Sequence, residues 1–185
     1  MSARPKLGFI GLGAMGRPMA LNLMKAGYAM TVYARRAQAL EPLVAAGART
    51  AANPAEVARA ADVVFSLVTA SADSEAVALG AEGLIEGARD GSVVIDMATI
   101  SPLATRHIAQ ALAARGIEHI DAPVSGGPAG AQGATLSIMV GGNTYVDPVA
   151  RIAPLSFATL GDVRATIGRW WDPNVKAPQR MECKV

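Results

Sequence analysis

The chain has 185 residues, a length that suits one large α/β domain with its own hydrophobic core. With 51% hydrophobic and 17% charged residues it is not a disordered chain, and with only 4% aromatic residues its core must come from aliphatic side chains and methionine. The net charge is +2. The single cysteine, Cys183, excludes a disulfide scaffold, and the lack of a run of roughly 18 apolar residues excludes a membrane protein. Because no signal stretch is present, the sequence predicts a cytoplasmic protein.

The first predicted elements are a strand, a turn and a helix. Residues 6–10 are a short apolar run that ends at Gly11, and apolar residues then recur every three to four positions over residues 13–26. A second strand over residues 29–33 completes a β-α-β unit, and a second helix is predicted over residues 36–46.

The rest of the chain continues the alternation of strands and helices. Strands that alternate with helices form a mostly parallel sheet with helices on both faces. The sequence therefore predicts an α/β fold, a doubly wound sheet of the Rossmann type, over residues 1–163. After a short helix capped by Asn53, strands are predicted over residues 62–68, 92–96, 118–121 and 135–140, helices over residues 74–79, 101–115 and 146–158, and a turn-rich segment over residues 123–133.

The turn after the first strand has the spacing G-x-G-x-x-G of dinucleotide-binding proteins. The first glycine allows a tight turn, the second lets the backbone approach a pyrophosphate, and the third lets the helix pack close to the strand. A tight turn without a ligand is the alternative. A mononucleotide phosphate loop fits less well, because Arg17 and Pro18 stand where Lys and Ser or Thr are required. The residues of the turn are Gly11, Leu12, Gly13, Ala14, Met15 and Gly16.

Two arginines, Arg35 and Arg36, follow the second predicted strand. An acidic residue there would bond the ribose 2′-hydroxyl of NAD, whereas a guanidinium can grip the 2′-phosphate of NADP. Because no Asp or Glu lies within residues 31–40, NADP is predicted as the preferred cofactor, and NAD is the alternative. Both arginines could instead be solvated residues at a helix start.

Three segments resemble the β-hydroxyacid dehydrogenase family, the group of 3-hydroxyisobutyrate dehydrogenase, tartronate semialdehyde reductase and 6-phosphogluconate dehydrogenase. The first is residues 8–16 with Met19, Ala20, Asn22 and Leu23. The second is residues 121–131, which read DAPVSGGPAGA, followed by residues 133–136 and 139–142. The third, residues 96–102, is similar to the family's Asp-x-Ser-Thr-x-x-Pro loop, with Ala98 in place of Ser and Thr99 kept. The resemblance covers roughly residues 6–160.

The resemblance implies reversible hydride transfer between a short β-hydroxy acid, such as 3-hydroxyisobutyrate or glycerate, and a nicotinamide cofactor. It also implies that Val68 and Thr99 lie beside the cofactor, and that Ser125, Gly126 and Gly127 hold the substrate carboxylate. Taken alone, this last segment offers a hydroxyl and two unobstructed amides at a strand end, a pattern that also fits a plain turn. An imine reductase shares the cofactor motif and is the second enzyme class to consider.

Residues 164–185 differ from the family and from the rest of the chain. They carry five basic and two acidic residues and both tryptophans, and we expect an atypical, poorly ordered tail. The family has a catalytic lysine in a glycine-rich helical segment, with an asparagine four residues later, and Lys176 lies at nearly the expected place. Arg180, however, replaces that asparagine, and Pro178 forbids a helix interior. Lys176 is therefore either the catalytic residue or a solvated lysine.

The family's C-terminal helical domain does not appear in the sequence, which suggests a truncated or frame-shifted gene. Two hypotheses follow: an NADP-dependent dehydrogenase with reduced turnover, or a non-catalytic dinucleotide-binding module. Without that domain, the predicted helix over residues 146–158 is expected to have an uncovered apolar face that causes self-association. No metal site is predicted, because neither His107 nor His119 has other possible ligands at the required spacing. A nucleic-acid partner is not predicted either, because residues before 164 contain no cluster of basic and aromatic side chains.

Overall fold

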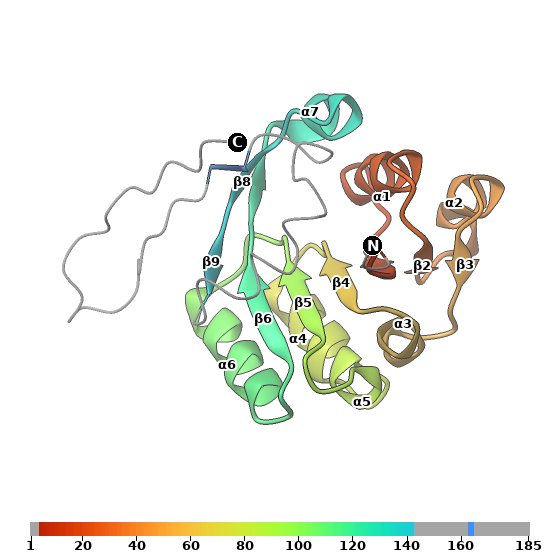
Figure 1. Cartoon of the computed structure of the whole chain (residues 1–185). Coiled ribbons are helices and arrows are strands. Elements are labelled where there is room, and N and C mark those ends of the chain that lie inside the picture. Colours follow the sequence, from red (N-terminus) through yellow and green to blue (C-terminus); the bar gives the residue numbers. More distant parts are fainter. Residues whose placement is uncertain (1–3, 143–162, 165–185) are drawn as a thin grey trace.

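The structure, a computed structural model, describes residues 4–142 and 163–164 (Figure 1). In these residues seven strands form one sheet in the order β3-β2-β1-β4-β5-β6-β9. Six of them run parallel, and β9 pairs antiparallel with β6, so the predicted doubly wound α/β fold is confirmed. The strands are β1 (Leu7–Ile10), β2 (Met30–Tyr33), β3 (Arg49–Thr50), β4 (Val63–Ser66), β5 (Val93–Asp96), β6 (Glu118–Asp121) and β9 (Gly141–Gly142).

Helices cover both faces of this sheet. The central strands are buried on both faces, which is why each reads as a run of apolar residues rather than as an alternation. One face carries α1 (Gly16–Lys25), the 3-10 turn η1 (Ala37–Ala39), α2 (Glu41–Ala45) and α7 (Gly127–Gly133). The other face carries α3 (Pro54–Ala60), α4 (Ser71–Leu79), α5 (Leu84–Gly87) and α6 (Pro102–Ala113).

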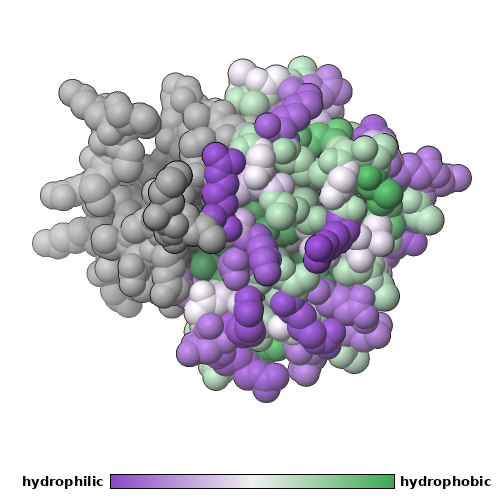
Figure 2. Space-filling view, turned by 45° about the vertical axis from the view of Figure 1, so that its right-hand side comes forward, coloured by the Kyte–Doolittle hydropathy of each residue, from purple (hydrophilic) through white to green (hydrophobic). Residues whose placement is uncertain are grey.

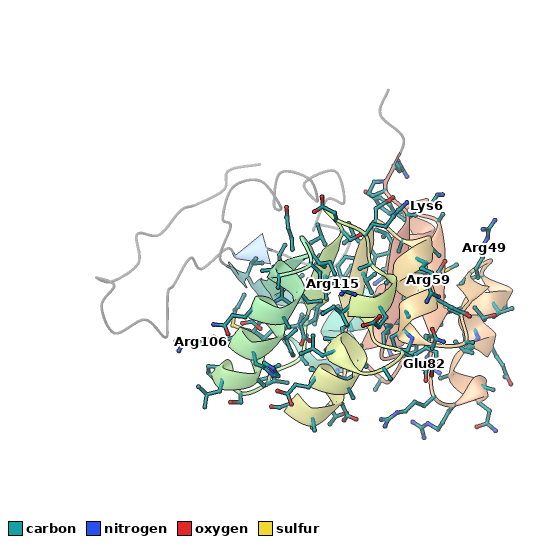
Figure 3. The ribbon with its side chains drawn as sticks, turned by 90° about the horizontal axis from the view of Figure 1, so that it is seen from below. Lys6, Arg49, Arg59, Glu82, Arg106 and Arg115 are labelled. Carbon is teal, nitrogen blue, oxygen red and sulfur yellow. The ribbon has the colours of Figure 1, made fainter. Side chains whose placement is uncertain are left out.

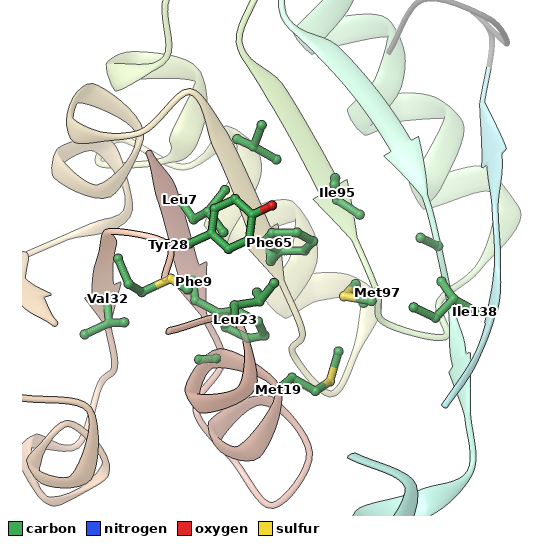
Figure 4. Packing of buried hydrophobic residues seen from close by; sticks show 14 of the residues in the cluster. Leu7, Phe9, Met19, Leu23, Tyr28, Val32, Phe65, Ile95, Met97 and Ile138 are labelled. Carbon is green, nitrogen blue, oxygen red and sulfur yellow. The ribbon is translucent and has the colours of Figure 1, made fainter. Parts of the chain in front are cut away.

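The core between the sheet and α1 fixes the helix that follows the glycine turn. Phe9 of β1 and Phe65 of β4 stack with their ring centroids 5.8 Å apart. Met19 and Leu23 of α1 are fully buried in the same cluster (Figure 4). Their spacing of four residues places them on one side of the helix, so the apolar pattern that predicted α1 is the pattern that docks it on β1 and β4.

The segment predicted as a turn over residues 123–133 contains a strand and a helix instead, so that prediction was wrong. In a second sheet, β7 (Val124–Ser125) pairs with β8 (Ser137–Met139), which also pairs with β10 (Val163–Arg164). Helix α7 follows β7 although it contains three glycines and a proline, which have low helix propensity. It gains support from α1, where the Asn22 side-chain amide donates to the carbonyl oxygens of Ala131 at 2.9 Å and Gln132 at 3.4 Å.

Smaller differences concern the ends of elements. Helix α1 begins at Gly16 because the preceding residues form a turn, and the predicted helix over residues 36–46 is divided into η1 and α2. Strands β3 and β9 and helix α5 have only two to four residues each, too few for a periodic pattern to show. The helix predicted over residues 146–158 lies outside the described residues.

The described surface mixes polar and apolar side chains. Figure 2 shows hydrophilic residues interspersed with hydrophobic ones over the visible face. None of the helices in the described part of the chain is long and apolar enough to cross a membrane. In Figure 3, seen from below, the labelled charged side chains come from separate elements and are spread over the view: Lys6, Arg49, Arg59, Glu82, Arg106 and Arg115.

Candidate functional site

Most of the predicted site residues follow the carboxyl ends of the parallel strands, which meet at one edge of the sheet. Gly11 follows β1, Arg35 follows β2, Val68 follows β4 and Thr99 follows β5. The chain moves outward from β1 to β3 and then returns to place β4 on the other side of β1. Open α/β sheets bind ligands at such a switch point, outside the carboxyl ends of the strands. The glycine turn after β1 lies at this point.

The three glycines of the turn face different surroundings. Gly11 has a φ of +92°, and a Cβ there would overlap the carbonyl oxygen of Leu67, whose amide donates to the Ile10 carbonyl oxygen at 2.9 Å. A Cβ on Gly16 would overlap the carbonyl oxygen of Gly11 and lie 2.9 Å from the Phe9 ring. At Gly13, by contrast, no atom of the described residues lies within 4 Å of a Cβ. Packing therefore requires two of the glycines, and the third borders open space.

The start of α1 presents the Gly16 amide beside this open space, whereas the Arg17 amide donates to the Gly13 carbonyl oxygen at 3.1 Å and Pro18 has no N–H. Among the described residues, no side chain caps the helix at Met15, and the first turn contains no acidic residue. The amides at a helix N-terminus lack partners within the helix and carry partial positive charge, which suits a phosphate group. The exposed positions of the turn, Gly13 and Ala14, leave the approach clear. The arrangement fits a pyrophosphate, as the motif predicts.

Arg35 and Arg36 are exposed in the loop after β2, at the same edge. The Arg35 Nη1 atom lies 3.5 Å from Oδ1 of Asp73 in the first turn of α4. The Arg35 side chain remains 79% exposed in this pair, so its other donors are open to a ligand. The pairing with Asp73 was not predicted, because 38 residues of sequence separate two groups that only the fold brings together.

The loop that carries Thr99 is held by a buried acid. Asp96 ends β5, and its Oδ1 atom accepts a hydrogen bond of 3.0 Å from the Ala98 amide. Burial raises the pKa of Asp96, while the Ala98 amide and the Ser74 hydroxyl act in the opposite direction. Thr99 itself is exposed, three residues past the end of β5, and Val68 lies two residues past the end of β4. The loop is thus rigid at its base and open at Thr99.

A second acid, Asp121, lies beside Asp96 on the neighbouring strand β6. Burial, together with the negative charge of Asp96, raises the pKa of Asp121 to about 7. Near neutral pH a large share of this carboxyl is therefore protonated, which limits the charge held at this edge. Sequence reasoning missed the pair, although the signal was present: both acids end consecutive predicted strands of a parallel sheet.

Ser125 ends β7, Gly126 follows it and Gly127 begins α7, and all three residues are exposed. Gly126 and Gly127 adopt φ values of +130° and +62°, which residues with side chains rarely do. Helix α7 packs beside α1 (Figure 1), and the hydrogen bonds from Asn22 join the two helices. The predicted carboxylate-binding segment is thereby linked to the helix of the predicted cofactor turn.

Three other residues, Lys176, His107 and His119, are not part of the described site. Lys176 lies outside the described residues. His107 Nδ1 lies 3.2 Å from Oε1 of Glu75, and burial lowers the pKa of His119 to about 4, so that imidazole is neutral at pH 7. Within the described part of the chain no three His, Cys, Asp or Glu residues gather as a metal site.

A polar hollow of about 400 Å³ lies at the opposite edge of the sheet. Its lining includes Asp62 and Ser92, which precede β4 and β5, and the Arg89 guanidinium lies 3.1 Å from the Asp62 carboxylate. The amino ends of the strands form this edge, so the hollow is remote from the glycine turn and from the loops after β2 and β5. It is separate from the candidate site.

The fold and the glycine turn define a Rossmann-type dinucleotide-binding domain, and residues 6–165 match the model of the NAD binding domain of 6-phosphogluconate dehydrogenase. The chain belongs to this family of β-hydroxyacid dehydrogenases. The NAD-dependent L-serine dehydrogenase of Pseudomonas aeruginosa is 45% identical over 146 residues, 79% of this chain and 49% of that protein. The Mycobacterium tuberculosis 3-hydroxyisobutyrate dehydrogenase structure has a TM-score of 0.78 at 31% identity, covering 87% of this chain and 54% of its own.

A further solved structure, Psf3 in complex with NADP+ and 2-OPP, has a TM-score of 0.79 at 30% identity, covering 85% of this chain and 55% of its own. Imine reductases share the fold at lower identity: the Streptomyces aurantiacus enzyme has a TM-score of 0.74 at 26% identity. The resemblance to the dehydrogenases is therefore the closer of the two. The chain spans about half the length of the curated relatives it matches.

Proposed function

We propose that this chain binds NADP(H) at the carboxyl edge of its sheet and acts in the oxidation of a short β-hydroxy acid such as 3-hydroxyisobutyrate. The observation that carries the proposal is the contrast within the glycine turn, where Gly11 and Gly16 are enclosed while Gly13 faces open space. An open glycine between two packed ones, at the start of a helix, fits a bound pyrophosphate. The family match over residues 6–165 supports the same function.

Each proposed role follows from a position at this edge. The amides between Gly13 and Gly16 bind the pyrophosphate, Arg35 and Arg36 pair with the 2′-phosphate, and the loops at Val68 and Thr99 border the nicotinamide. When bound, the nicotinamide accepts or donates the hydride. The Ser125 hydroxyl and the exposed amides that follow it bind the substrate carboxylate, next to α1 through the contact of α7 with Asn22. From the sequence, Lys176 is the candidate for moving the proton of the substrate hydroxyl, but Pro178 and Arg180 beside it argue against that role.

We expect the chain to oxidise 3-hydroxyisobutyrate or glycerate slowly. A general acid/base contributes roughly a hundredfold to ten-thousandfold to a rate, and here Arg180 replaces the asparagine that accompanies the family's lysine. NADPH formation is therefore expected at least about a hundredfold below the ordinary range of about 1 to 10 per second. Lys176→Ala should cause no further loss.

Turnover in the ordinary range that Lys176→Ala abolishes would contradict this expectation and assign the proton transfer to Lys176. A second candidate function, a non-catalytic dinucleotide-binding module, is favoured by the replacement of the asparagine by Arg180. Tight NADPH binding without oxidation of any acid in a panel of β-hydroxy acids would support that second function.

Replacing Arg35 and Arg36 together by Ala should lower the ratio of NADP(H) to NAD(H) affinity about tenfold to a hundredfold. Losing a charge-assisted contact to the 2′-phosphate costs roughly 1.5 to 3 kcal/mol, whereas NAD lacks that phosphate. Fluorescence titrations with NADPH and NADH measure both affinities. The matched control replaces Arg49 of β3 and Arg59 of α3, which are also exposed, and should leave the ratio unchanged. An unchanged ratio in the first variant means that the two arginines are only solvated.

A further inference from the structure

We propose that Asp73 tunes the preference for NADP over NAD by competing with the 2′-phosphate for Arg35. This inference rests on the proposed binding of NADP(H) at the carboxyl edge. It assigns a specificity-determining role to a residue of α4 that belongs to none of the motifs in the sequence.

The position of Asp73 follows from the topology of the sheet. Strands β2 and β4 flank β1 on its two sides, so the loop after β2 and the helix after β4 face each other across the glycine turn. Arg35 comes from that loop and Asp73 from the first turn of that helix, and their side chains meet with Nη1 and Oδ1 3.5 Å apart. The pair therefore spans the place where the adenosine ribose of a bound dinucleotide lies.

The charge of Asp73 opposes the binding of a phosphate to Arg35. A guanidinium offers its donors in one planar fork, so a phosphate on Arg35 must displace the carboxylate or share the fork with it, close to a second negative charge. The 2′-hydroxyl of NAD is neutral and meets no such opposition. The carboxylate thus reduces the advantage that Arg35 gives to NADP without reducing NAD binding.

The size of the effect follows from exposure. The side chains of Arg35 and Asp73 are 79% and 33% exposed, and pairs of this kind are worth little in water. We therefore expect Asp73→Asn to strengthen NADPH binding about threefold to fivefold and to change NADH binding less than about 1.5-fold. The gain should shrink when the salt concentration rises from about 0.1 M to about 1 M, since the Debye length falls from roughly 10 Å to 3 Å.

Glu75 provides the matched control on the same helix. Its carboxylate lies 3.2 Å from His107 Nδ1 instead of facing Arg35, so Glu75→Gln removes the same charge at a different place. Both variants are titrated with NADPH and with NADH by fluorescence, and thermal unfolding checks that each is folded. Glu75→Gln should leave both affinities unchanged. An equal gain in this variant would overturn the proposal, because the effect would then come from net charge alone.

A double-mutant cycle separates the proposed route from a direct one. In an Arg35→Ala background, Asp73→Asn should give a gain below about 1.5-fold, because the arginine that Asp73 contacts is then absent. A full gain in that background, or no gain in the wild type, would overturn the proposal while NADP(H) binding itself stands. Failure of the wild type to bind either dinucleotide would instead overturn the proposed function, and this inference with it.

Discussion

Gly13→Val is expected to weaken NADPH binding at least about a hundredfold, roughly 2.7 kcal/mol, and to leave the melting temperature within about 2 °C of the wild type. The backbone at Gly13 is exposed, and no atom of the described residues lies within 4 Å of a Cβ there, so the folded chain has room for the side chain. The two methyl groups would occupy the space through which a pyrophosphate approaches the amides of α1. Fluorescence titration with NADPH and thermal unfolding measure the two quantities.

Gly133 supplies a matched control for this substitution. A Cβ there makes only ordinary contacts, the nearest at 3.6 Å from Thr135 Oγ1, and the residue lies at the end of α7. Gly133→Val should therefore bind NADPH as the wild type does. If Gly13→Val also keeps the wild-type affinity, the pyrophosphate does not lie over this turn and the proposed function is wrong.

Gly16→Val, unlike Gly13→Val, is expected to destabilise the fold itself. The free energy of unfolding should fall by roughly 2 to 5 kcal/mol, or the chain should fail to fold. The Cβ overlaps the Gly11 carbonyl oxygen, and Gly11 is itself packed closely against the backbone of Leu67. The Phe9 ring, 2.9 Å away, is fixed by its stacking on Phe65. Unfolding in urea, monitored by far-UV circular dichroism, gives the free energy of unfolding. A midpoint equal to that of Gly13→Val would mean that α1 shifts without cost.

The pattern of apolar residues predicted most of the sheet, because each strand or helix is marked by a pattern that lies within its own short segment of sequence. The strand over residues 118–121 matches β6, and the helix predicted after Asn53 is α3, where the Asn53 side chain accepts a hydrogen bond from the Glu56 amide. Helix α7 escaped prediction because its support comes from Asn22, a long way back in the chain. Propensity describes the segment alone, and tertiary contact overrides it.

The same distinction holds for the candidate site. Gly11, Gly13 and Gly16 could be predicted because their roles depend on a turn between two adjacent elements. The contact of Arg35 with Asp73 could not, since it requires β2 and β4 to lie on opposite sides of β1. The contact of Asp96 with Asp121 could be predicted only in part. The sequence shows that each acid ends a strand, but it does not show that the two strands are neighbours in the sheet.

The hydrogen bond from Asn22 to Ala131 has a consequence for the order of assembly, since it joins residues 109 positions apart. Strand β1 and helix α1 leave the ribosome first, yet β1 needs β4 as its neighbour, and α1 needs α7 to cover its outer side. Contacts between residues so distant in sequence stabilise the fold only after the chain has lost the entropy of closing a long loop. We therefore expect the glycine turn, which precedes α7 by more than a hundred residues, to become rigid only after α7 has been synthesised.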